Sequence, residues 1–308
     1  MRILVTGASG FIGSRVAEVV AARWPETSVV GVGRSARPPR PAGPANYEYV
    51  SCDLSEAGME RKLPAQVNVV MHLAGDRRTF IPPQEYTRQI MANVVNTSRM
   101  ADYAVQAGAE LFLFASSVYA YSGQTTAPFQ EDKLCLPAEN LGATKVAAES
   151  LLRARAIVGQ FKALAFRIFT VYGPGSSAGQ FIPQAIAKLG SAGPVAKFGA
   201  PDVQRDFVYI DDVADAFAAG LAFRERDIQF EAVNIGSGKG TSIREVVLLL
   251  ASLMGSRKQM TFDPDPKSKA DTNHQADIAR AQSLLGWKPA VSLETGLRRT
   301  VEALALTR

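Results

Sequence analysis

The chain has 308 residues, of which 47% are hydrophobic and 20% are charged, and its formal net charge is +5. These proportions are typical of a soluble globular protein with a sizeable core. Cys52 and Cys135 lie far apart and His72 and His274 are the only histidines, so neither a disulfide framework nor a zinc cluster is expected. The basic residues are scattered, which favours small anionic ligands over nucleic acid as partners.

The location expected for the chain is the cytoplasm. Apolar runs are all much shorter than a membrane span, so we expect no membrane partner. The N-terminus enters an apolar strand pattern at once and lacks the pattern of a signal peptide.

A glycine motif at the N-terminus is the most informative part of the chain. The apolar run Ile3 to Val5 predicts a short buried strand, and Gly7, Gly10 and Gly13 follow before a helical apolar pattern begins at Ile12. Strand, glycine turn and helix is the setting in which such a motif binds a dinucleotide, with the pyrophosphate at the helix N-terminus. The spacing is GxxGxxG rather than GxGxxG, and the alternative is a glycine turn that binds no ligand.

The second predicted strand, residues 28–32, bears on the choice between NAD and NADP. A carboxylate about 20 residues after the glycines would bind the ribose 2′-hydroxyl of NAD. Here that place holds Gly33, followed by Arg34 and then Arg37. A missing carboxylate beside an arginine slightly favours the 2′-phosphate of NADP, although both arginines could be surface charges on a proline-rich loop.

Further strands and helices alternate along the first 170 residues. We expect strands at 47–50, 67–71, 111–115 and 163–169, and helices at 84–106 and 142–158. This alternation predicts an α/β fold of Rossmann type, a doubly wound parallel sheet that binds ligands at the carboxyl ends of its strands. Asp53 follows one strand and could accept a hydrogen bond from the adenine amino group or cap a helical turn. Ala74 and Gly75 follow the next strand and are small enough to lie against a cofactor.

The character of the sequence changes at about residue 171, where elements become shorter and Gly and Pro more frequent. We expect a dinucleotide-binding domain over 1–170 and a smaller, discontinuous α/β substrate lobe over 171–308. A helical pattern within 207–225 is expected to return to the first domain. Residues 233–235, 243–254 and 276–285 predict a short strand and two helices.

Several motifs resemble those of the extended short-chain dehydrogenase/reductases, in particular the nucleotide-sugar epimerases and dehydratases of the NAD-dependent epimerase/dehydratase family. The resemblance spans nearly the whole chain. Its motifs are Thr6–Gly13, Asp53–Leu54, Phe114–Ser117 with Ala120–Gly123, Phe166–Gly175, Arg205–Val213, Asn234–Gly238 and Leu284–Pro289.

The resemblance implies an NAD or NADP cofactor, a small-molecule nucleotide sugar as substrate, and a possible homodimer built from helices like 84–106 and 142–158. It implies that Arg205 holds the sugar diphosphate, for which a guanidinium is well suited, and that Thr170, Lys267 and Lys269 lie near the substrate. The alternative for Arg205 is a surface pair with Asp206. The implied cofactor-binding residues are Gly7, Gly10, Phe11, Ile12, Gly13, Arg34, Asp53, Leu54, Leu73, Ala74, Gly75, Asn93 and Lys145.

One departure from the family affects the chemistry directly. The family uses a Tyr and a Lys four residues apart on one helical face, where the Lys lowers the pKa of the Tyr from about 10 and the Tyr exchanges a proton with the substrate. Here Lys145 is present, but Leu141 occupies the Tyr position. Ser117 matches the catalytic Ser or Thr. Of the two tyrosines that follow it, Tyr121 matches a position that is usually structural in the family, so Tyr119 is the better candidate for a relocated acid/base.

These features leave more than one function open. The leading interpretation is an NAD(P)-dependent epimerase or reductase of nucleotide sugars with an altered acid/base. The alternatives are a non-catalytic protein that binds dinucleotide and sugar nucleotide, and a reductase of a non-nucleotide carbonyl compound. Sugar-nucleotide 4,6-dehydration is disfavoured, because Val118 and Tyr119 stand where dehydratases carry an Asp-Glu pair.

Overall fold

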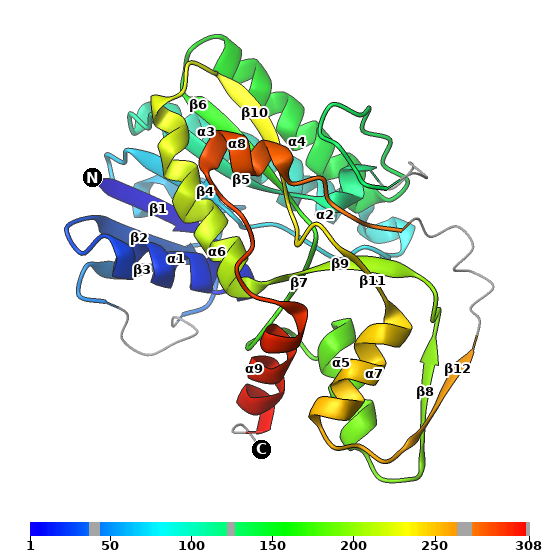
Figure 1. The fold of residues 1–308 in the computed structure, drawn as a ribbon. Coiled ribbons are helices and arrows are strands. Elements are labelled where there is room, and N and C mark those ends of the chain that lie inside the picture. Colours follow the sequence, from blue (N-terminus) through cyan, green and yellow to red (C-terminus); the bar gives the residue numbers. More distant parts are fainter. Residues whose placement is uncertain (37–43, 122–126, 264–272, 306–308) are drawn as a thin grey trace.

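The computed structural model describes residues 1–36, 44–121, 127–263 and 273–305. It has a larger lobe built on a seven-stranded sheet and a smaller lobe below it in the view of Figure 1. Arg37, Lys267 and Lys269, which the sequence analysis named, fall outside the described residues. In the described part of the chain, none of the helices has both the length and the apolar character that crossing a membrane requires.

The large sheet is parallel throughout, with strand order β10-β6-β5-β4-β1-β2-β3. This confirms the expected doubly wound Rossmann-type fold, because the order reverses at β1 as the chain winds first to one side and then to the other. Its strands are β1 (Arg2–Thr6), β2 (Ser28–Gly33), β3 (Tyr47–Ser51), β4 (Val69–His72), β5 (Leu111–Ser117), β6 (Lys162–Ile168) and β10 (Phe230–Ile235).

Helices cover both faces of this sheet. On one face, α1 (Phe11–Arg23), α6 (Ile210–Ala219) and α8 (Ala279–Leu285) bury apolar side chains against β1, β5 and β6. On the other, α3 (Asn96–Gln106) and α4 (Asn140–Ile157) pack against the opposite side chains of the same strands. The strands are therefore apolar on both faces, as buried parallel strands must be. Short 3-10 turns occur at η1 (Met59–Lys62), η4 (Val118–Tyr121) and η5 (Gly220–Glu225).

The helix within 207–225 lies on the larger lobe, where α6 packs along α1. Two ion pairs join these helices, Arg15 with Asp211 at 2.7 Å and Arg23 with Asp215. The chain then continues into β10, which pairs with β6. The expected boundaries assigned residues 226–308 to the smaller lobe, and the structure differs here: β10 and α8 belong to the larger lobe. Because the β10 segment is short in sequence, its pairing partner could not be inferred from its apolar pattern.

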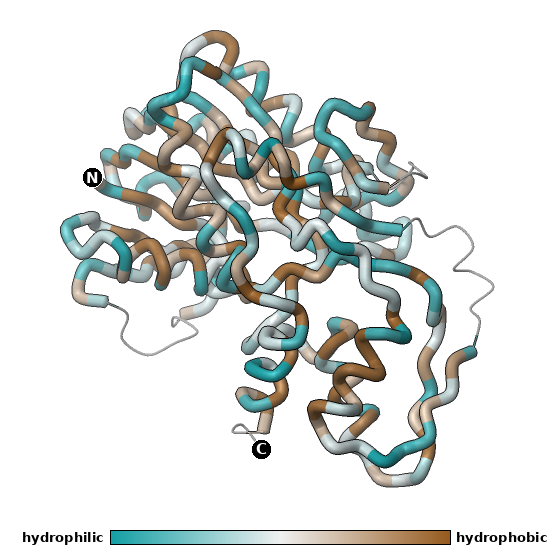
Figure 2. Tube along the Cα trace, in the orientation of Figure 1, coloured by the Kyte–Doolittle hydropathy of each residue, from teal (hydrophilic) through white to brown (hydrophobic). Residues whose placement is uncertain are grey.

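The smaller lobe combines two small sheets with three helices. β9 (Gln204–Tyr209) pairs with β7 (Thr170–Tyr172) on one side and with β11 (Gly240–Ser242) on the other, and β8 (Val195–Gly199) pairs with β12 (Gln259–Asp263). α5 (Phe181–Gly190), α7 (Ile243–Leu253) and α9 (Leu293–Ala305) surround a second apolar core. Figure 2 shows apolar stretches in the strands of the large sheet and along α7. A capping box between Ser242 and Glu245 begins α7.

The helix expected over 84–106 is broken into four parts. A 3-10 turn η2 (Pro83–Glu85) leads into α2 (Tyr86–Ile90), a π turn η3 (Met91–Val95) and α3. The extra residue of a π turn changes which side chains face inward. Gln89 and Asn93 are both buried, and both donate to backbone carbonyls of the loop after β4. The interruption therefore places polar side chains under this loop.

A buried ion pair fastens α4 to the sheet. The Arg167 guanidinium on β6 donates to Glu149 on α4 at 2.8 Å, and the two side chains are 8% and 6% exposed. Glu149 also accepts from the Ser116 hydroxyl, and Arg167 donates to the Tyr121 hydroxyl at 2.7 Å. Tyr121 in turn donates to the Asn234 side chain at 3.0 Å. Because each charge has several partners, this buried pair satisfies the condition under which such pairs are tolerated.

Replacing Arg167 by Met is expected to lower the free energy of unfolding by about 3–5 kcal/mol, because Glu149 would be buried without its counter-charge. Urea unfolding followed by circular dichroism measures the change. The matched control is Arg298→Ala, which breaks the exposed pair with Glu294 and should cost no more than about 0.5 kcal/mol. A loss below about 1 kcal/mol in the Arg167 variant would contradict this account.

Candidate active site

The glycine turn after β1 is packed so closely that side chains are excluded. Gly7 has a φ of 71°, and a Cβ there would lie 2.8 Å from the backbone of Leu73 and of Ala74. A Cβ on Gly13 would lie 2.2 Å from the carbonyl oxygen of Gly7. The turn thus packs against both the end of β4 and the first turn of α1. This is the close approach that the sequence motif predicts.

The N-terminus of α1 is suited to bind an anion. Gly10 is the N-cap and supplies no side-chain cap, and the first turn holds no acidic residue. The first N–H groups of a helix lack partners within it and carry the positive end of the helix dipole. Phe11 and Ile12 lie in this turn, and Gly175 from the smaller lobe approaches the Phe11 ring. A phosphate placed here would accept hydrogen bonds from these N–H groups.

The ends of β2 and β3 form the next part of the site. A Cβ on Gly33 would lie 2.5 Å from the hydroxyl of Ser9 and 2.6 Å from that of Tyr49, so a larger side chain would require these hydroxyls to move. Arg34 follows and is exposed. Asp53 accepts from the backbone and hydroxyl of Ser55; these bonds, and to a smaller degree the charge of Arg34, lower its pKa. Arg34 therefore lies close enough to Asp53 to act on it, and Leu54 beside it is buried.

The loop that follows β4 is held in place by the side chains of Thr6 and Asn93. The Thr6 hydroxyl accepts from the backbone N–H groups of Leu73 and Ala74 at 3.2 and 3.1 Å. Asn93 accepts from the N–H of Asp76 at 2.7 Å and donates to its carbonyl at 2.9 Å. A Cβ on Gly75 would lie 2.7 Å from the Asn93 side chain. Asn93 thus holds this loop in place, with both of its polar atoms engaged by the protein.

His72 at the end of β4 is a packed core residue. It is fully buried, and its two ring nitrogens contact the hydroxyls of Thr6 at 2.7 Å and Thr97 at 3.1 Å. Burial, and then the charge of Lys145, lower its pKa to about 3. The imidazole is therefore neutral and is occupied by structural hydrogen bonds.

Lys145 lies deep in the site on α4. Its Nζ donates to the carbonyl oxygen of Ala115 on β5 at 2.7 Å and lies 3.5 Å from where a Cβ on Gly75 would be. Burial lowers its pKa to about 8, an effect that Glu149 partly offsets. Leu141, one turn earlier on α4, is 3% exposed. The helix therefore carries a buried amine at residue 145 and a buried hydrocarbon side chain at residue 141.

Ser117 and Tyr119 follow directly from β5 and approach α4. The backbone N–H of Tyr119 donates to the Ser117 hydroxyl at 3.3 Å. The Tyr119 carbonyl packs on Gly142, where a Cβ would lie 2.1 Å from that oxygen. Ser117 and Tyr119 are half-buried, whereas Tyr121 is fully buried and bonded to Asn234 and Arg167. Tyr119 thus adjoins the turn of α4 that carries Leu141, and Tyr121 is part of the core.

Arg205 and Thr170 lie on β9 and β7 at the junction of the two lobes. Arg205 is half-buried, and its Nη1 donates to the carbonyl of Gln204 at 2.8 Å. A surface pair with Asp206 does not form, because Asp206 is fully buried and accepts from Ser237, Gly238 and Ala276. Alternation along β9 turns the two side chains to opposite faces.

Two side chains near the site had not been recognised from the sequence. Glu149 lies four residues after Lys145, so helical spacing could have indicated it. His274 is 2% exposed and its ring lies 5.9 Å from that of Tyr119 in an edge-on arrangement. Tyr119 and His274 are 155 positions apart in the sequence, and no local pattern links them.

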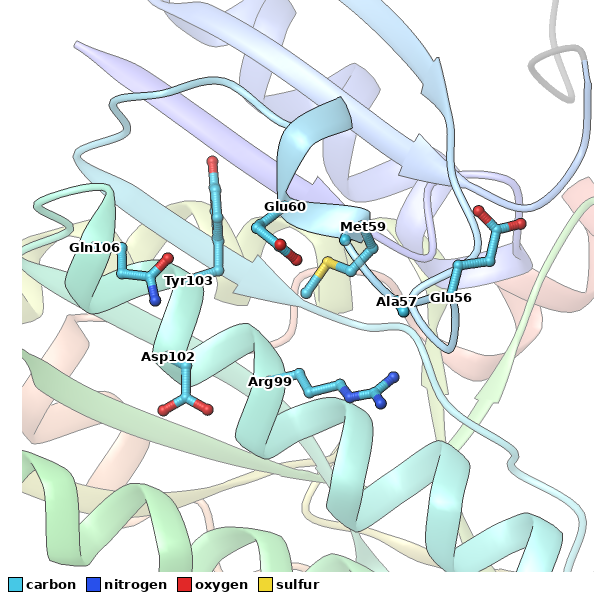
Figure 3. Close-up of a pocket in the computed structure, with 9 residues that line it drawn as sticks. Glu56, Ala57, Met59, Glu60, Arg99, Asp102, Tyr103 and Gln106 are labelled. Atoms are coloured by element: carbon cyan, nitrogen blue, oxygen red, sulfur yellow. The ribbon is translucent and has the colours of Figure 1, made fainter.

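A shallow pocket of 220 Å³ lies elsewhere, between η1 and α3 (Figure 3). It contains none of the predicted site residues. Its lining is largely charged or polar and includes Glu56, Glu60, Arg99 and Asp102. In the described part of the chain, no three His, Cys, Asp or Glu side chains are grouped so as to hold a metal ion.

Comparison with known proteins agrees with this architecture. UDP-glucose 4-epimerase of Azospirillum brasilense is 30% identical over 324 residues, covering 97% of this chain and 90% of that protein. UDP-glucuronate 4-epimerase of Thermodesulfobacterium geofontis is also 30% identical, with 97% and 94% covered. Among solved structures, MoeE5 in complex with UDP-glucuronic acid and NAD superposes with a TM-score of 0.86 at 32% identity, with both chains covered completely.

The family model for the NAD dependent epimerase/dehydratase family matches residues 3–236. This range includes the glycine turn, the β4 loop, Ser117, Lys145 and Arg205. The chain belongs to the NAD dependent epimerase/dehydratase family.

Proposed function

We propose that the protein is an NAD(P)-dependent epimerase or reductase of a nucleotide-linked sugar that works without a Tyr at residue 141. The observation that carries this proposal is the placement of Lys145. Its amine is held by the Ala115 carbonyl, beside Gly75 and next to the strand that ends at Ser117. A buried amine would be costly to keep without a function that uses it.

The glycine turn and the α1 N-terminus fit a dinucleotide, with its pyrophosphate on the N–H groups of Phe11 to Gly13. Asp53 and Arg34 lie where the adenosine would be, and Lys145 where the second ribose would be. Such a cofactor accepts or donates a hydride. The protein's own contribution is to bind it along the carboxyl ends of β1, β2 and β4 and to orient its reactive end toward Ser117.

Proton transfer to or from the sugar oxygen falls to side chains near Lys145. The Ser117 hydroxyl can hydrogen-bond that oxygen, but it is a weak base at neutral pH. The backbone of Tyr119 adjoins both Ser117 and the α4 turn of Leu141, so its phenol is the one that we propose for this step. We assign it the role of proton carrier, because a phenol can act as a general acid or base.

The sugar nucleotide is assigned to the junction of the lobes, where Arg205 would bind the diphosphate. Lys267 and Lys269 belong to the same proposal. The two relatives compared above are named as 4-epimerases of UDP-glucose and UDP-glucuronate, so UDP sugars come first in any test. A 4,6-dehydration is disfavoured, since the residues after Ser117 provide no carboxylate.

Leu141 supports a second candidate, a non-catalytic protein that binds dinucleotide and sugar nucleotide. A hydrocarbon in the usual acid/base position is the result expected if catalysis had been lost.

The proposal of a homodimer is supported by apolar side chains that remain exposed on the α2–η3 and α4 surfaces, among them Ile90, Met91 and Leu151. A cytoplasmic location is supported by the free thiols of Cys52 and Cys135.

Turnover on a panel of UDP-, dTDP-, GDP- and CDP-sugars with NAD and NADP, followed by NMR of the sugar, tests the function. We expect conversion of at least one compound, reduced roughly 100-fold or more in Lys145→Ala and in Ser117→Ala. Unchanged turnover in both variants would contradict the assigned site. Tight binding of both ligands without conversion would establish the non-catalytic candidate instead.

Arg34→Ala is expected to weaken NADP binding roughly 10-fold while leaving NAD binding unchanged, because one charge-assisted contact to the 2′-phosphate is lost. Isothermal titration calorimetry with both dinucleotides gives the two affinities. Arg298→Ala on α9 is the control for a lost surface charge. Equal effects on NAD and NADP, or none, would show that Arg34 does not select between them.

Arg205→Ala is expected to weaken binding of the converted sugar nucleotide at least about 10-fold, because the diphosphate loses a charged donor. Binding of the dinucleotide should not change. Calorimetry on this variant and on Arg257→Ala, an exposed arginine of the same lobe, makes the comparison. Unaltered sugar-nucleotide affinity would instead favour the reductase of a non-nucleotide carbonyl compound.

A further inference from the structure

His274 is held firmly at the junction of the two lobes. Its backbone N–H donates to Gln204 on β9 at 3.1 Å, and the segment continues into a bridge between Ala276 and Phe129. The side chain is 2% exposed, and its Nδ1 has no hydrogen-bond partner among the described residues. A buried ring nitrogen without a partner is unusual, since most buried polar atoms are paired.

Two aromatic rings enclose this imidazole. The Tyr119 ring lies 5.9 Å away with an interplanar angle of 86°, and the Phe129 ring lies 5.9 Å away at 53°. Edge-on contacts between rings favour defined geometries over free rotation. Because Phe129 is itself fully buried, the His274 ring cannot easily move away from Tyr119. The contact between the two rings therefore restricts where the Tyr119 ring can lie.

The Tyr119 backbone is fixed independently of this contact. Its N–H is bonded to the Ser117 hydroxyl, and its carbonyl packs on Gly142. These two contacts involve only the backbone, whereas His274 contacts the side chain of Tyr119. His274 is a ring-bearing residue that contacts the Tyr119 ring from a different part of the chain, across the junction between the lobes.

We propose that His274 is a positioning residue, whose ring holds the Tyr119 phenol in the orientation needed for proton exchange near Ser117. This inference rests on the proposed function, because it requires Tyr119 to carry the proton. The imidazole acts through its shape and its ring edge, and it neither gives nor takes a proton itself. Burial, and then the charge of Arg205, lower its pKa to about 3, so it stays neutral while Tyr119 works.

A pair of substitutions separates ring contact from simple filling of space. His274→Phe keeps an aromatic ring at this position, whereas His274→Leu keeps a similar apolar volume without a ring. We expect kcat to fall about 10-fold in His274→Leu and less than about 3-fold in His274→Phe, the size of effect that one aromatic contact supports. KM for the sugar nucleotide should change little in either variant.

A double-mutant cycle with Tyr119→Phe tests whether His274 acts through the phenol. If it does, His274→Leu should have no further effect on kcat once the phenolic hydroxyl is gone. A merely structural role would lower kcat equally in both backgrounds, and that result would overturn the proposal. Phe262→Ala, which removes a ring packed at a tilt against Phe198 in the smaller lobe, is the control and should leave kcat unchanged.

Crystal structures of the two His274 variants provide a readout that needs no turnover. The Tyr119 side chain should keep its rotamer in His274→Phe and leave it in His274→Leu. The same rotamer in both would overturn the proposal even if kcat had fallen. Full activity of Tyr119→Phe alone would show instead that the proton carrier was assigned wrongly, which is a failure of the proposed function.

Discussion

The ion pair between Glu149 and Arg167 is the interaction on which the candidate site depends most. It joins α4 to β6 within the core, and through the Ser116 hydroxyl it also reaches β5. Lys145 lies one helical turn from Glu149, so the pair holds to the sheet the helix that carries the amine. The same carboxylate partly offsets the burial that lowers the pKa of Lys145. One buried contact therefore bears on both the placement of the helix and the pKa of the amine.

The remaining parts of the site follow from parallel-sheet geometry. The carboxyl ends of β1, β2, β4 and β5 all meet at one edge, which brings the glycine turn, Arg34, the β4 loop and Ser117 together. The smaller lobe adds Arg205 on β9 and His274 on the segment beside it. Under the proposed function, the departure from the family at Leu141 is therefore a local one. This is the physical basis for seeking a replacement proton carrier nearby.

The sequence predicted the parts of this site that are local in the chain. The glycine turn and the strand ends are read from spacing over a few residues, Lys145 follows from the family resemblance, and the parallel sheet follows from the alternation of strands and helices. The π turn at Met91–Val95 was missed because one extra residue barely alters an apolar pattern. The place of β10 in the large sheet and the contact of His274 with Tyr119 depend on pairing between distant segments. Spacing within one segment carries no information about such contacts.

The central claim is that a nucleotide-sugar reaction proceeds here with Tyr119 in place of the missing Tyr at residue 141. The most direct measurement is kcat of Tyr119→Phe on whichever sugar nucleotide the wild-type protein converts, with dinucleotide affinity measured alongside. The account predicts a fall of roughly 100-fold or more in kcat, the usual contribution of a positioned acid or base, with unchanged dinucleotide binding. Wild-type kcat in this variant would contradict it and leave Ser117 and Lys145 to act without a phenol.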